Sequence, residues 1–124
     1  LVLEWTDPPF APGHWIPEMV EMAGGFSVLG QTGEKSCRIT WEEAQNSAPD
    51  VVVCAPCGFD LEKSTVLAKQ VRGHFPGIPV WAADANASFA RPGPRLIDGI
   101  EALASIFHPG SVPPCPDTVR KLVE

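Results

Sequence analysis

The 124-residue chain has few cysteines, which argues against a small domain held together by disulfides or by a structural zinc ion. Four cysteines are too few for a scaffold held together by disulfides. A structural zinc site would need two further ligands spaced as closely as Cys54 and Cys57. Neither the remaining cysteines nor His14 offer that spacing. We therefore expect no disulfide framework and no metal site.

Positive charge is also scarce. Nine Lys and Arg residues against fifteen Asp and Glu give a net charge of −6, and the basic residues are scattered along the chain. Binding to the phosphates of nucleic acids needs a basic stripe. The apolar runs are much shorter than the roughly 20 residues that cross a bilayer. We expect no nucleic-acid partner and no membrane insertion.

The beginning of the chain lacks the marks of a secretory signal. It opens on "LVLEW", which predicts a strand, without a charged leader or a cleavage site. We expect the domain to be a processed or excised piece. The sequence alone therefore leaves the compartment of the parent protein unknown.

What is present is an ordinary mixture of 44% hydrophobic and 19% charged residues, arranged as alternating strands and helices. This alternation predicts the α/β class, with a mostly parallel sheet covered by helices on both faces. Thr40 with Glu43, and Asp60, are typical helix caps. The expected strands are 1–5, 26–30, 51–54 and 80–83; the expected helices are 15–23, 40–48, 61–74, 94–108 and 118–124.

Ligands of parallel sheets bind outside the carboxyl ends of the strands. This rule selects three loops, at 6–14, 54–60 and 85–93. The loops and their borders carry side chains that a plain connection does not need, and exposed aromatic residues on one rim are typical of a surface that binds a flat, apolar ligand. These residues are Phe10, His14, Trp15, Cys57, Gly58, Phe59, Asn86, Ser88, Phe89 and Arg91.

Cys54 and Cys57 form a C-x-x-C between a predicted strand and a predicted helix, where a thioredoxin-type enzyme carries its redox pair. Such an enzyme needs its first cysteine exposed at the helix N-terminus, with a lowered pKa. Here Cys54 continues the apolar run "VVVC", and Pro56 separates it from the helix. We expect Cys54 to be a small buried hydrophobe, and a thiol-disulfide oxidoreductase is the alternative function.

Other catalytic signatures are missing from the sequence. It contains no Walker loop, no G-x-G-x-x-G and no G-x-S-x-G, and no spacing pairs its carboxylates into a catalytic dyad. We therefore expect a protein that is not an enzyme.

Three longer stretches carry a family resemblance: "EWTDPPFAPGHWIPEMVEMAGG", "TWEEAQNSAPDVVVCAPCGFDLEKS" and "DANASFARPGPRLIDGIEALASIFHP". Together they resemble the C-terminal lobe of the cobalamin-binding branch of periplasmic-type ABC transporter substrate-binding proteins, the cluster of vitamin B12 and iron-siderophore binders. The resemblance covers residues 1–109, which we expect to form a single ligand-binding lobe. Residues 110–124 are expected to form a Pro-rich tail with a short terminal helix.

The resemblance implies a three-layer α/β/α, Rossmann-like lobe that binds a corrinoid such as cobalamin and requires no cofactor. It also implies an N-terminal lobe as the second wall of the cleft, an ABC transporter permease as a partner, and a place outside the cytoplasm. Some vitamin B12 binders carry tryptophan where this chain has Ser88. An interaction domain derived from such a lobe is a further alternative. The resemblance places the following residues in the cleft: Asp7, Pro8, Pro9, Phe10, Gly13, His14, Trp15, Cys57, Gly58, Phe59, Asn86, Ser88, Phe89 and Arg91.

Overall fold

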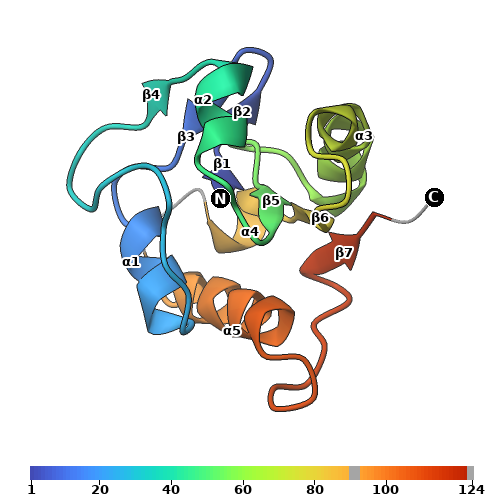
Figure 1. Ribbon diagram of the computed structural model, residues 1–124. Coiled ribbons are helices and arrows are strands. Elements are labelled where there is room, and N and C mark those ends of the chain that lie inside the picture. The colour runs from blue at the N-terminus through green and yellow to red at the C-terminus, as the bar shows by residue number, and fades with distance from the viewer. Residues whose placement is uncertain (90–92, 123–124) are drawn as a thin grey trace.

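The computed structural model describes residues 1–89 and 93–122 and shows a mixed α/β protein built on a mostly parallel, four-stranded sheet (Figure 1). The strand order is β1-β5-β6-β7, in which β1, β5 and β6 run parallel and β7 runs antiparallel to β6. The expected α/β class with a mostly parallel sheet is confirmed. The four strands are β1 (Val2–Leu3), β5 (Val52–Cys54), β6 (Val80–Ala83) and β7 (Val119–Lys121).

Side chains of the sheet pack in two hydrophobic clusters. Val52 and Cys54 point into one cluster and Val53 into the other, and none of the three is more than 1% exposed. A strand buried on both faces needs a continuous apolar run rather than an alternating one. This explains why the apolar residues of "DVVVCA" follow one another without alternating polar residues.

Different helices contribute to the two clusters. Ala44 of α2 and Ala68 of α3 pack in the cluster of Val52, whereas Met19 of α1 and Leu103 of α5 pack in the cluster of Val53. Figure 1 shows α1 and α5 next to each other, away from α2 and α3. The four helices are α1 (Ile16–Met22), α2 (Trp41–Asn46), α3 (Leu61–Val71) and α5 (Arg95–Phe107).

The predicted helix caps are confirmed. The Thr40 side chain accepts a hydrogen bond from the backbone amide of Glu43, and the Glu43 carboxylate accepts one from the backbone amide of Thr40. These two hydrogen bonds form a capping box. The Asp60 carboxylate accepts the amide of Lys63 at 2.9 Å and begins α3. A 3-10 turn, η1 (Arg72–His74), continues α3.

The prediction of one strand at 1–5 and a plain loop at 6–14 was wrong. The chain leaves the parallel sheet at Glu4, and the next residues fold back on themselves, with Trp5 opposite Phe10. A distant segment then pairs with this hairpin, which makes a second, three-stranded antiparallel sheet. Its strands are β2 (Trp5–Thr6), β3 (Pro9–Ala11) and β4 (Cys37–Arg38).

Two further predictions also failed. Residues 26–30 do not form a strand; Val28 and Leu29 pack on the core as irregular chain, without a paired strand in the described residues. The predicted loop 85–93 begins instead with a short helix, α4 (Ala85–Ser88), whose first turn is capped by the Asp84 carboxylate.

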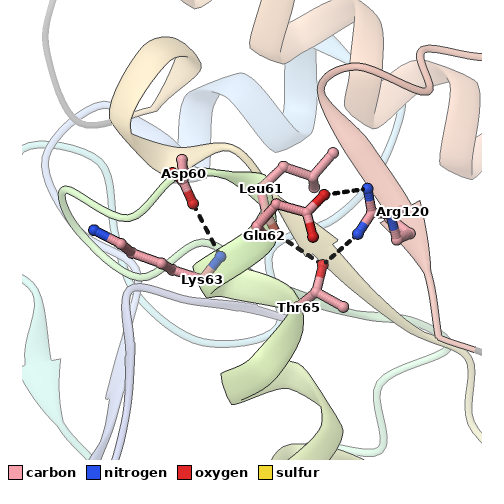
Figure 2. Close-up of polar contacts among 6 residues, drawn as sticks. All are labelled: Asp60, Leu61, Glu62, Lys63, Thr65 and Arg120. Carbon is pink, nitrogen blue, oxygen red and sulfur yellow. Dashed lines mark hydrogen bonds and ion pairs between the residues drawn. The ribbon is translucent and has the colours of Figure 1, made fainter.

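The prediction of a terminal helix at 118–124 was wrong: within the described residues, Val119–Lys121 form a strand instead. β7 pairs with β6, and the buried side chains of Val119 and Leu122 enter opposite clusters. Arg120 ties β7 to α3: its guanidinium donates to Glu62 at 2.8 Å and to the Thr65 hydroxyl at 3.4 Å (Figure 2). The hydrogen bond from Arg120 lowers the pKa of the exposed Glu62.

Candidate functional site

The segments that follow β1, β5 and β6 meet at the carboxyl edge of the parallel sheet. We call these segments, residues 4–15, 55–59 and 84–89, the rim. Hydrogen bonds and ring contacts join each segment to the next. The strand-end rule therefore selected segments that the fold does bring together.

The first and second segments are in contact just beyond β1 and β5. The Cys57 amide donates to the Glu4 carbonyl at 3.1 Å. Next to this bond the rings of Trp5 and Phe59 meet edge to face, with centroids 5.2 Å apart. This arrangement is a favourable one for an aromatic pair.

The third segment contacts both of the others. The Asn86 amide donates to the Phe59 carbonyl at 3.0 Å, which joins it to the second segment. The Trp15 indole donates to the Phe89 carbonyl at 2.9 Å, which joins it to the first. The contacts among the three segments thus form a closed circuit.

The turn at Gly13 and His14 has little conformational freedom. A Cβ on Gly13 would lie 2.2 Å from the Ser36 nitrogen, so this position accepts only glycine without a shift of the backbone. His14 has a φ of 56°, in the left-handed region that side chains other than glycine seldom adopt. Its amide donates to the Glu34 carbonyl at 2.6 Å, and its carbonyl accepts the Gly33 amide at 2.9 Å.

The predicted site residues differ in their exposure, and they fall into three groups. The side chains of Asp7, His14, Cys57 and Asn86 are exposed, as is Gly58. Those of Phe10, Trp15 and Phe59 are half-buried, as is Pro8.

The third group consists of four residues of the rim that are not accessible. Pro9, Gly13, Ser88 and Phe89 are buried. Phe89 is 1% exposed and packs in the cluster of Val53, so the expectation that its ring faces a ligand does not fit the structure. The backbone of α4 turns this ring into the core. Arg91 lies outside the described residues.

Sequence reasoning missed Glu4. Its half-buried carboxylate accepts a hydrogen bond from the Gly13 amide within the first segment of the rim. Burial raises the pKa of this carboxyl, although the Gly13 hydrogen bond and the nearby His14 lower it in part. The available signal was a single acidic residue in the apolar stretch "LVLEW", directly after the predicted strand.

Cys54 lacks the properties of a redox nucleophile. Its side chain is 0% exposed, and burial raises the pKa of the thiol to about 12. A nucleophilic thiol needs exposure and a lowered pKa. Cys54 and Cys57 are both free thiols in this structure.

Residues 1–89 and 93–122 contain neither a metal-binding cluster nor a membrane-spanning helix. No group of three or more His, Cys, Asp or Glu side chains in this part of the chain could hold a metal ion. No helix there has the length and apolar character needed to cross a bilayer.

A hollow of about 1000 Å³ lies at the opposite, amino edge of the sheet. We call it the amino-edge hollow. None of the predicted site residues in the described part of the chain lines it. Its apolar wall includes Phe26, Val28, Trp81, Ile106, Phe107 and Cys115.

We compared the chain with family models, with curated proteins and with solved structures, and no match was found.

Proposed function

We propose that this chain is a non-enzymatic lobe of a substrate-binding protein, and that its rim forms one wall of a site for a corrinoid such as cobalamin. The observation that carries the proposal is the closed circuit of contacts among the three strand-end segments. It gathers half-buried rings and exposed polar groups on one edge of the sheet. A flat macrocycle with an amide periphery needs this combination of surfaces.

In this proposal each rim residue has a role that its exposure permits. The half-buried rings of Phe10, Trp15 and Phe59 stack on the face of the macrocycle. The exposed side chains of His14 and Asn86 form hydrogen bonds with its amides. Phe89 supports the rim from within the core.

The proposal extends to the architecture and the partners. Two hydrophobic clusters, fed by opposite faces of the sheet, support a three-layer, Rossmann-like lobe. A second, N-terminal lobe would supply the other wall of the cleft, and an ABC transporter permease would receive the ligand. Both partners follow from the sequence resemblance.

Equilibrium dialysis with cyanocobalamin tests the proposal. We expect saturable binding that Phe59→Ala weakens about tenfold, because stacking contacts contribute on the order of 1–1.5 kcal/mol. Phe26→Ala is the matched control, since Phe26 lies at the amino-edge hollow. Absence of saturable binding, or equal weakening by the two variants, would contradict a corrinoid site at the rim.

A further inference from the structure

Glu4 makes three hydrogen bonds within the rim, two in its own segment and one to the second segment. Its amide donates to the Phe10 carbonyl and its carbonyl accepts the Cys57 amide, each at 3.1 Å. Its carboxylate accepts the amide of Gly13. The first two contacts use the backbone and survive any substitution except proline at the donor, whereas the third needs an acceptor in the side chain.

The third contact lies directly beside the strained turn. Gly13 is buried, so its amide has little access to water if the carboxylate is removed. The next residue, His14, is exposed and holds its left-handed conformation through the bonds to Gly33 and Glu34. Backbone strain at an exposed side chain on a rim is a reason to seek a function for that side chain.

We propose that Glu4 is a positioning residue, whose carboxylate holds the Gly13 amide and so sets the turn that presents His14 and Trp15 to the ligand. This inference rests on the proposed corrinoid site. Glu4 itself does not touch the ligand. The contact requires an oxygen acceptor, and the charge strengthens it, since the Gly13 hydrogen bond lowers the pKa of Glu4.

Two variants separate the acceptor from the charge. Glu4→Gln keeps a side-chain oxygen that can accept the Gly13 amide, and Glu4→Ala removes it. For Glu4→Gln we expect cyanocobalamin affinity within about threefold of wild type, and for Glu4→Ala a loss of about tenfold. Such a loss corresponds to one hydrogen bond of ordinary strength. Glu34→Ala is the control, because Glu34 holds His14 through its carbonyl and its side chain is exposed.

Two-dimensional NMR of the amides gives a readout that does not depend on the ligand. The Gly13 and His14 resonances should keep their positions in Glu4→Gln and move in Glu4→Ala. If Glu4→Ala does not fold, Glu4→Met replaces it, since methionine keeps the length of the side chain without its oxygens.

The outcomes distinguish this inference from the proposed function. Wild-type affinity in Glu4→Ala, or a loss as large in Glu4→Gln as in Glu4→Ala, would overturn the positioning role. If the wild-type chain binds no cyanocobalamin, the proposed function fails and the amide resonances decide alone. Unchanged Gly13 and His14 resonances in Glu4→Ala then overturn the role of Glu4, and resonances that move only in Glu4→Ala support it.

Discussion

At the carboxyl edge of the sheet, main-chain hydrogen bonds join one loop to the next, whereas at the amino edge the chain surrounds a hollow of about 1000 Å³. The wall of the hollow is largely apolar. Its Phe26 is 79% exposed, and none of the predicted site residues that the structure describes lines the hollow. At the rim, the side chains stand on a backbone that hydrogen bonds between the segments hold in place. Volume alone would select the amino edge, and preorganisation selects the carboxyl edge.

The largest expected effect separates two phenylalanines, one from each edge. Phe89→Ala should lower the free energy of unfolding by about 3–5 kcal/mol, because it empties a fully buried site. Phe26→Ala should change it by less than about 0.5 kcal/mol, since that ring faces solvent. Urea denaturation of both variants measures the difference. Equal losses would mean that Phe26 belongs to the core as much as Phe89 does.

A pair of glycines sharpens the comparison. In Gly13→Ala the new Cβ meets backbone atoms of residues 34–36, and we expect a loss of about 3 kcal/mol, since overpacking here must move the chain. In Gly25→Ala the three atoms nearest to the new Cβ belong to the ring of Phe107, the closest at 2.7 Å, and we expect this side chain to shift more easily than a backbone. A loss below about 1 kcal/mol is expected there. Thermal or urea unfolding checks both values, and a costly Gly25→Ala would show that the amino edge is as rigid as the rim.

Thiol labelling tests where the buried strand ends and the rim begins. With a pKa of about 12, roughly one Cys54 thiol in 10⁴ is ionised at pH 8, and the side chain is 0% exposed. We expect iodoacetamide to label the exposed Cys57 at least about a hundredfold faster, as followed by peptide mass spectrometry. Comparable rates, together with insulin reduction that Cys57→Ser abolishes, would favour the oxidoreductase alternative.

The smallest expected effect is a pH dependence from Glu4. Its pKa is raised in the folded protein, so its contribution to stability is fully present below the ordinary pKa of 4.5 and is lost as the pH rises through the raised value. Wild type should therefore lose stability relative to Glu4→Gln as the pH increases from 4.5 towards neutrality. Glu62, whose pKa is lowered, acts in the opposite direction but is common to both proteins. Urea unfolding at several pH values measures the difference, and a constant difference would contradict the burial of Glu4.

Local chemistry explains the parts of the fold that were predictable. Thr40 and Asp60 predict helix starts because the capping side chain bonds to an amide only three residues further along the chain. The strand at Val52–Cys54 and the strand at Val80–Ala83 were recognisable because a buried strand is apolar along its whole length. The order of strands and helices then predicted which loops share an edge.

The elements of the fold that were not predicted depend on pairing partners that are distant in the sequence. β3 pairs with β4, and β7 with β6, through contacts that no local pattern records. Residues 26–30 have a composition typical of a strand but no partner strand in the described part of the chain. Phe89 was predicted to be a rim residue because it comes soon after a strand, but it follows the short helix α4 and its side chain packs in the core.

The hydrogen bonds from Cys57 to Glu4 and from Asn86 to Phe59 use peptide groups alone. Their geometry is therefore indifferent to the identity of the side chains beside them. An edge held in this way can exchange its outward residues and keep its shape. We expect libraries randomised at Phe10, Cys57 and Asn86 to yield mostly folded proteins, which makes this edge a scaffold for binding ligands of other shapes.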